Sequence, residues 1–355
     1  MDNYNSRRVA LKFFFTACLM AAMYYFVMEK IRRPVEVDGG YREIMGTFAR
    51  VVAVAKHERQ ARRYIEAGFG ELVRIDKMMS DYKPDSELSK VNREAFTNPV
   101  KVSPELFEIL QKSVAFSRLS NGAFDITVGP LVDLWHKAGE ANAVPDENTL
   151  AAAKARVGFE KLILDANERT VRFAVKGMRL DLGGIAKGYA VDKAVEAMRR
   201  EGAIGGMVDA GGDIRCFGKP ADKDTWRVGL QNPVAANPTN SNGAIGTEQV
   251  LMVLKLNDMA VATSGDYRRF VTIGGKRYSH IIDTSTATGA SKLSSDTILA
   301  ANAVDADALS TAVNVMGAEK GLALVESLDG VEAILIIAGP EYKVVKSGGA
   351  DTYLQ

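Results

Sequence analysis

Cysteine is scarce in this chain of 355 residues, which contains only Cys18 and Cys216. Cys18 lies in an apolar N-terminal run, so Cys216 stands alone in the rest of the sequence. This excludes an internal disulfide there, and with it the disulfide framework of small secreted domains. The scarcity neither requires nor forbids an oxidising compartment.

Net charge is also small, at +1 from 45 basic and 44 acidic side chains. The first 33 residues hold six of the basic and two of the acidic side chains, which leaves 39 basic against 42 acidic ones in the remainder. No basic surface of the kind that binds nucleic acid is expected. Histidine is limited to three positions, and His57 and His136 are read as ordinary residues on helices or helix edges.

The remaining composition is that of a globular protein. Hydrophobic residues make up 47% and charged residues 25% of the chain, which are ordinary values. A chain of this length can bury a large core, as one elaborate domain or as two closely joined ones.

The N-terminus carries the pattern of a membrane segment. Residues 13–28 are apolar except for Thr16, and counting from Val9 gives a helix of roughly 30 Å, about the thickness of a bilayer core. Basic residues flank both ends, so charge alone does not fix the orientation. Residues 6–12 resemble a twin-arginine export motif. We expect residues 1–33 to be an uncleaved signal anchor in the inner membrane, with the remainder in the periplasm; cleavage, or lipidation at Cys18, stays an alternative.

From residue 34 onward, short strands and helices alternate without an internal repeat. Apolar residues at three- and four-residue spacing predict a long helix over 57–80, and Ser103 with Pro104 predicts the start of another. The final helix is expected at about 305–316. A strand is predicted over 44–55, with the turn-like Met45-Gly46-Thr47 inside it. Further predicted strands cover 250–256, 259–263, 268–273, 276–282, 331–337 and 342–345.

Hairpins mixed with helices predict an α+β fold of mixed, largely antiparallel sheets with packed helices. Gly274-Gly275 is a strong hairpin signal. The polar, Asn-rich stretch at 232–247 is expected to be a surface insertion. The whole of 34–355 is read as one functional domain.

The most informative segment runs from Leu180 to Asp192. Asp181 stands at the end of an expected buried strand, Gly183-Gly184 opens the backbone, and Lys187 follows in the expected first turn of a helix. Glycines allow close approach of a ligand, and a helix N-terminus favours an anion. The pattern indicates a phosphorylated ligand, although it lacks the Gly-Lys-Ser/Thr of a Walker loop. On its own, a plain glycine-rich turn with a solvated lysine explains it equally well.

Seven further segments join this one in the order and spacing of the ApbE family, the FAD:protein FMN transferases, and the sequence resembles that family over about residues 41–350. Thr284 departs from the family pattern, because proline usually stands there, and its turn is expected to be less rigid. The other segments are Met45-Gly46-Thr47, Asp81-Tyr82 with Leu88-Ser89, residues 122–130, residues 209–213, residues 264–267, residues 280–283 and residues 307–311.

The resemblance implies specific roles for residues of this chain. Magnesium would be held by the Gly184 carbonyl, Asp307 and Thr311, with Ser310 at a position where some members offer a second carboxylate. Asp307 and Thr311 are four apart, so a helix would place them on one face. FAD would be contacted by Met45, Tyr82, Ala123, Phe124, Asp125, Asp181, Lys187 and Ile281. Phe124 is as readily explained by packing.

The implied reaction moves FMN from FAD to a threonine or serine hydroxyl of an acceptor protein and releases AMP. Magnesium and Lys187 would offset the charge that develops on the leaving group, and His280 is the candidate base. The acceptor would be an exported or membrane-bound electron-transfer protein. A magnesium-dependent FAD pyrophosphatase and a non-enzymatic flavin carrier stay open as alternatives. Asp209, Asp213 and Asp266 are read as turn residues beside glycines.

Overall fold

The computed structural model describes residues 16, 18–20, 23–24, 33–233, 250–265, 270–337 and 343–355. Within these ranges, no helix combines the length and the hydropathy that a bilayer crossing requires. Most of the expected anchor and most of the expected insertion at 232–247 lie outside the described residues, so both stay predictions.

An eight-stranded sheet forms the centre of the fold, and every neighbouring pair in it is antiparallel. This confirms the predicted α+β class with largely antiparallel pairing. In spatial order the strands are β1 (Val35–Ile44), β2 (Thr47–Ala55), β6 (Gly205–Ala210), β7 (Asp213–Gly218), β10 (Ala260–Gly265), β15 (Leu293–Ala300), β16 (Glu332–Ile337) and β17 (Lys343–Lys346).

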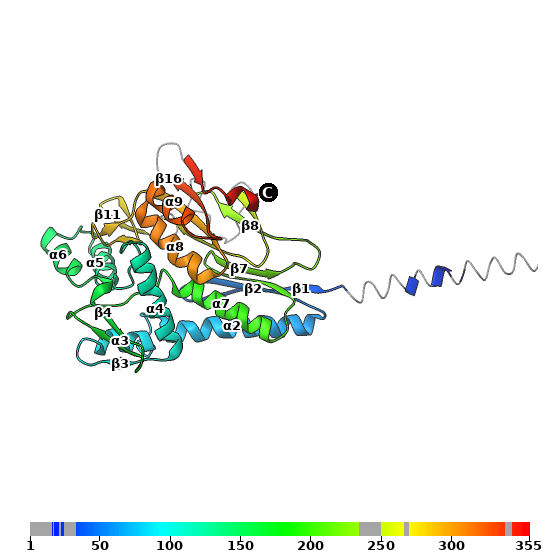
Figure 1. Ribbon diagram of the computed structural model, residues 1–355, viewed down its shortest axis with the longest axis horizontal. Helices are drawn as coiled ribbons and strands as arrows, with labels where there is room; N and C mark the ends of the chain where they lie inside the picture. The colour runs from blue at the N-terminus through cyan, green and yellow to red at the C-terminus, as the bar shows by residue number, and fades with distance from the viewer. Residues whose placement is uncertain are drawn as a thin grey trace, which may run out of the picture.

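Three helices cover one face of the sheet: α2 (Glu58–Met79), α7 (Ala186–Arg200) and α8 (Ala303–Met316). They lie side by side in Figure 1, with α7 between the other two. Alternate residues of β2 explain this layer, because Val51 and Ala53 are buried in the same apolar core as α2 and α7. The covering helices therefore bring the start of α7 next to α8.

The opposite face is covered by a hairpin of β8 (Trp226–Gln231) and β9 (Val250–Leu256), together with the turn η3 (Ala350–Tyr353). Val52 and Val54 of β2 point to this second core. Because β2 is buried on both faces, it reads as a nearly continuous apolar run rather than as an alternating one.

The smaller strands form sheets of their own beside the central one, in the orders β3-β5-β4, β11-β12 and β13-β14. Figure 1 shows α3, β3 and β4 at one corner, with α5, α6 and β11 next to each other along the same side. Their bounds are α3 (Glu87–Glu94), β3 (Val100–Lys101), α4 (Pro104–Leu119), α5 (Gly129–Glu140), α6 (Glu147–Lys154), η1 (Phe159–Lys161), β4 (Leu162–Asp165), β5 (Thr170–Phe173), β11 (Phe270–Ile273), β12 (Lys276–Ser279), β13 (Ile282–Asp283), β14 (Thr288–Gly289) and α9 (Ala318–Glu326).

Several predicted elements are confirmed. Helix α2 spans the predicted range to within one residue at each end. Ser103 caps α4, because its hydroxyl accepts the Leu106 N–H at 3.2 Å. Gly274 and Gly275 both have positive φ and join β11 to β12 as a two-residue hairpin.

Three element predictions are wrong. The predicted strand over 44–55 is not continuous. Met45 and Gly46 take φ of 56° and 63° and reverse the chain between β1 and β2, which form a hairpin. The strand over 276–282 breaks at His280, which separates β12 from β13. The helix over 305–316 is not the last one, because α9 follows it. Gly321 in α9 allows close packing, since a Cβ there would lie 2.7 Å from Val313 Cγ1.

Candidate functional site

Helices α7 and α8 touch at Gly188. A Cβ at this position would lie 2.2 Å from the Ala303 carbonyl oxygen and 2.8 Å from Asp307 Cβ, so only glycine allows this approach. The Gly188 N–H donates to Asp307 Oδ2 at 2.9 Å. The first turn of α7 is thereby fixed against the residue that the sequence predicts as a metal ligand.

A buried aspartate holds the two helices in register. Asp192 on α7 accepts the N–H groups of Ala303 and Val304 at 2.9 Å each, at the start of α8. Arg215 donates to the same carboxylate at 2.7 Å. Burial raises the pKa of Asp192, and these hydrogen bonds oppose the rise. The N-terminus of α8 therefore has a fixed place relative to α7.

Lys187 lies between two buried carboxylates. Its ammonium group pairs with Asp213 Oδ2 and lies 3.7 Å from Asp307 Oδ1. The side chains of Asp213 and Asp307 are 4% and 5% exposed. Burial raises the pKa of Asp307, the charge of Asp213 raises it further, and Lys187 opposes both. With both carboxylates ionised, the group carries one net negative charge, which favours a bound cation.

Gly184 and Thr311 also meet. A Cβ at residue 184 would lie 2.7 Å from Thr311 Oγ1, so the backbone before α7 rests on the face of α8 that carries Asp307. A carboxylate, a hydroxyl and a main-chain segment thus converge from two distant stretches. These are oxygen donors, which suit a hard cation such as Mg²⁺. Within the described ranges, no three His, Cys, Asp or Glu side chains cluster as a metal site.

Ser310 belongs to a separate hydrogen-bond network, with Ser264 and Asp296. Its hydroxyl lies 2.7 Å from Asp296 Oδ1 and 2.7 Å from the hydroxyl of Ser264. Asn314 donates to Asp296 Oδ2 at 2.8 Å. Burial raises the pKa of Asp296 to about 7. The hydroxyl of Ser310 is therefore engaged within the protein, and its metal role stays a prediction.

An arginine-centred cluster adjoins both Asp181 and Tyr82 in the sequence. Arg179 donates to Asp81 Oδ2 at 2.6 Å and also pairs with Asp133. Burial raises the pKa of Asp81 to about 6, with a further rise from the charge of Asp181. The neighbouring Tyr82 is 75% exposed, and Asp181 Oδ1 accepts the Gly183 N–H at 2.7 Å. Asp181 is therefore close enough for its charge to act on Asp81, the residue before Tyr82.

The segment predicted to contact FAD at Ala123–Asp125 is largely structural in its side chains. Phe124 is 2% exposed and meets the Phe116 ring edge-on at 6.2 Å. Asp125 accepts the Thr127 N–H and the Phe159 N–H at 2.8 and 2.9 Å. Burial raises its pKa. Any contact of Phe124 with a ligand must therefore come from its main chain.

Ile281 connects the His280 segment to α8. It is buried with Ala290 and Val315, and Ala123 packs against this group. Val315 lies four residues after Thr311, about 6 Å along the helix axis. His280 itself is exposed at the break between β12 and β13. The predicted base is thus within reach of solvent and of another protein.

Met45 belongs to a hairpin that abuts a second hairpin. A Cβ at Gly211, between β6 and β7, would lie 2.5 Å from Thr47 Oγ1. Gly211 and Gly212 take positive φ, and Asp209 accepts the Gly212 N–H at 2.9 Å as a turn residue does.

Asp213 differs from Asp209, because its carboxylate is buried against Lys187. Sequence reasoning missed Asp213, and its place as the first residue of a strand was the available signal.

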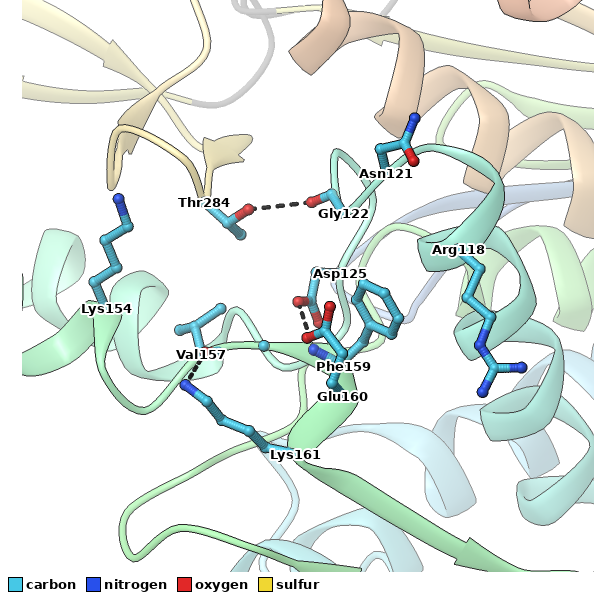
Figure 2. Close-up of a pocket in the computed structure, with 11 residues that line it drawn as sticks. Arg118, Asn121, Gly122, Asp125, Lys154, Val157, Phe159, Glu160, Lys161 and Thr284 are labelled. Carbon is cyan, nitrogen blue, oxygen red and sulfur yellow. Dashed lines mark hydrogen bonds between the residues drawn. The ribbon is translucent and has the colours of Figure 1, made fainter.

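A hollow of about 600 Å³ opens beside the Ala123–Asp125 segment. Figure 2 shows Thr284 donating to the Gly122 carbonyl across its upper rim, at 3.1 Å. This bond ties the turn after Asp283 to the loop before Asp125, where the family pattern has a proline. The hollow is lined by Asp125 but not by Lys187 or Asp307.

Comparison with known proteins matches this geometry to one family. The ApbE family profile matches residues 45–335. The FAD:protein FMN transferase of Haemophilus influenzae is 35% identical over 284 residues, 78% of this chain and 79% of that protein. The protein of the same name from Treponema pallidum is 33% identical and covers 86% of this chain and 85% of its own length.

Solved structures agree. The ApbE protein of Thermotoga maritima superposes with a TM-score of 0.79 at 31% identity, covering 91% of this chain and all of that one. The flavin transferase ApbE of Vibrio cholerae gives a TM-score of 0.76 at 29% identity, over 90% of this chain and 99% of that one.

Proposed function

Because this chain belongs to the ApbE family and is an FAD:protein FMN transferase, we propose that it transfers FMN from FAD to a threonine or serine hydroxyl of an acceptor protein, with release of AMP and with magnesium as cofactor. The observation that carries the proposal is the convergence of Gly184, Asp307 and Thr311 beside the first turn of α7.

The start of α7 suits the phosphates of FAD. The helix has no acidic residue of its own in its first turn and no side-chain cap at Ile185, and the negative charge that meets its positive end comes from α8, where Asp307 accepts the Gly188 N–H. Lys187 adds a full charge on the same turn. We place the pyrophosphate of FAD against this turn, with Asp181 and Tyr82 toward the rest of the nucleotide.

Asp307, Thr311 and the Gly184 carbonyl would hold the magnesium ion. Bound there, Mg²⁺ supplies charge neutralisation to the phosphate oxygens. Two hydrogen bonds support this donor set. The Gly188 N–H orients the Asp307 carboxylate, and Asp192 anchors the start of α8. Asp213 and Lys187 set the net charge around it.

Transfer begins with attack by the hydroxyl of the acceptor protein. The acceptor hydroxyl forms a bond to the phosphorus of the FMN half, and the bond to the bridging oxygen breaks, so AMP leaves with that oxygen. The hydroxyl proton passes to the imidazole of His280, which is exposed to an approaching protein. Placement of the hydroxyl in line with the leaving group supplies the rest of the catalysis.

We further propose that the N-terminal segment anchors the protein in the inner membrane with the catalytic domain in the periplasm. The apolar run at 13–28 supports the anchor, and the resemblance of residues 6–12 to a twin-arginine export motif supports the periplasmic side. Acceptors would then be exported or membrane-bound electron-transfer proteins.

The test is direct. The protein is incubated with FAD, Mg²⁺ and a periplasmic or membrane acceptor, and flavin fluorescence is sought on the acceptor after denaturing electrophoresis. A mass increase of one FMN on a threonine or serine, lost with EDTA, is expected. Release of FMN and AMP without a labelled acceptor would instead support hydrolysis. Binding of FAD without any turnover would support a carrier.

A further inference from the structure

The β11–β12 hairpin has one face that no other element of the described chain uses for core packing. Its two strands pair with Phe270 opposite Ser279 and Thr272 opposite Arg277. Because side chains alternate along a strand, these four share one face. Val271, Ile273 and Tyr278 occupy the other face and pack against α5. The Arg277 face therefore points away from α5.

A hollow of about 260 Å³ adjoins this hairpin, between β12 and the segment 288–291. The nine residues that line it include Lys276 and Arg277 and no aspartate or glutamate. Gly289 closes one end, since a Cβ there would lie 2.8 Å from the Ser279 N and O atoms. The hollow is smaller than the roughly 300–1,000 Å³ typical of small-molecule sites, and it suits a side chain of a docked protein.

The cations at this hollow rest on aromatic rings. The Arg277 guanidinium lies 4.5 Å from the Phe270 ring centre, and the Lys276 ammonium lies 5.2 Å from that of Tyr278. Neither forms a salt bridge with any residue that the structure describes. An exposed cation held over a ring keeps its charge available to an incoming carboxylate.

The hollow is continuous with the candidate catalytic segment. Ser279 lines it, His280 is the next residue, and Ile281 after that is buried against α8. Arg277 precedes His280 by three residues, about 10 Å along an extended strand. A polypeptide that places its hydroxyl at His280 would thus pass Arg277 within about three residues.

We propose that this hairpin face docks an acidic segment of the acceptor protein, with a carboxylate near Arg277 and the acceptor hydroxyl at His280. The inference rests on the proposed function and adds the chemistry of its protein substrate. Acceptors with an aspartate or glutamate about three residues from the modified hydroxyl are preferred.

The test uses single-threonine peptides that differ in one residue, three positions before or after the threonine, with aspartate, glutamine or lysine at that place. FMN transfer is followed by mass spectrometry for the wild type, Arg277→Glu and Arg172→Glu. Arg172 is exposed on β5, away from the hairpin, and is the matched control. For the wild type and the control, we expect the aspartate peptide to show a KM about tenfold below that of the lysine peptide.

Arg277→Glu should reverse this order while FAD affinity stays unchanged. Equal use of the three peptides by the wild type, or the same order in Arg277→Glu as in the wild type, overturns the inference, as does the absence of label on every peptide under conditions in which a protein acceptor is labelled. Failure of the proposed function looks different, because then no acceptor of any kind gains FMN from FAD.

Discussion

The backbone N–H of Gly188 on α7 donates to the Asp307 carboxylate on α8, at a point where the two helices are too close for any side chain at residue 188. The turn proposed to bind phosphate and the helix face proposed to bind the metal are thereby linked by one hydrogen bond. This contact explains why a glycine must follow Lys187.

Gly188→Ala should weaken both the fold and the activity. The added methyl group would meet the Ala303 carbonyl oxygen, so α7 and α8 must separate, at a cost of about 1–3 kcal/mol in the free energy of unfolding. Urea denaturation measures the loss. Gly70→Ala is the control, because nothing lies within 4 Å of its Cβ position, and it should keep or raise stability. Equal stability of the two variants would contradict the helix-contact argument.

Lys187→Met should lower the rate of transfer by about 100-fold or more, since it removes the cation nearest the proposed pyrophosphate. It also leaves Asp213 and Asp307 facing each other. Adding Asp213→Asn should recover part of the lost stability, with a coupling of about 1–3 kcal/mol in a double-mutant cycle. Lys193→Met, on the same helix, should leave the rate near that of the wild type. An additive cycle would show that Lys187 and Asp213 do not interact.

Thr311→Val keeps the shape of the side chain and removes its oxygen. We expect the Mg²⁺ concentration for half-maximal transfer to rise about tenfold or more, because a ligand oxygen is lost. Thr311→Ser retains that oxygen and should behave like the wild type. The measurement is a magnesium titration of FMN transfer at saturating FAD. An unchanged Mg²⁺ requirement in Thr311→Val would remove Thr311 from the metal site.

His280→Gln should reduce transfer by about 100-fold or more, within the usual range for loss of a general base, and leave FAD affinity unchanged. The side chain is exposed, so the fold should not suffer. The transfer rate of the variant should recover in part as pH rises above 8, because solvent hydroxide can then remove the proton of the acceptor hydroxyl. A His280→Gln variant with wild-type turnover would assign the base elsewhere.

Stability should depend on pH through Asp81. Its pKa is about 6 in the folded chain against 3.8 as the reference, so the folded state binds more protons between these values. The free energy of unfolding therefore falls as pH rises from about 4 to 6, by about 1 kcal/mol after allowing for the partial exposure of the group.

Asp81→Asn should flatten this slope, because no proton is then exchanged at the site. Urea denaturation at pH 4, 5, 6 and 7 measures it, and Asp222→Asn at an exposed loop position is the matched control. The same slope in Asp81→Asn as in the wild type would rule out Asp81 as the source.

Sequence reasoning predicted the regular elements best where a single pattern dominated. The regular spacing of apolar residues in α2 and the glycine pair of the β11–β12 turn are both visible in a short stretch of sequence, so both elements were recognised. Met45-Gly46-Thr47 was recognised as turn-like, but the reversal between β1 and β2 was not predicted, because Met45 is a non-glycine residue with positive φ. Helix α9 was missed since it is short and interrupted by Gly321.

The candidate site was predictable only through the resemblance to a family. The Gly184–Thr311 and Gly188–Asp307 contacts join stretches more than 110 residues apart, and no local pattern contains that information. Asp213 illustrates the limit, because its neighbours are turn glycines while its own carboxylate is buried against Lys187. The hydrogen bond between Ser310 and Asp296 likewise could not be predicted, because the two residues meet only in the folded chain.

The anchoring of α8 by Asp192 has a consequence for ion choice. The proposed ligands lie on α8 (Asp307 and Thr311) and just before α7 (Gly184), and buried hydrogen bonds fix these two helices relative to each other. Side-chain rotation alone would therefore not widen the space between the ligands. A larger ion such as Ca²⁺, which takes longer bonds and more ligands, would have to push the helices apart. At the proposed magnesium site, discrimination by ionic radius would therefore depend on the packing of two helices rather than on the chemistry of the ligands.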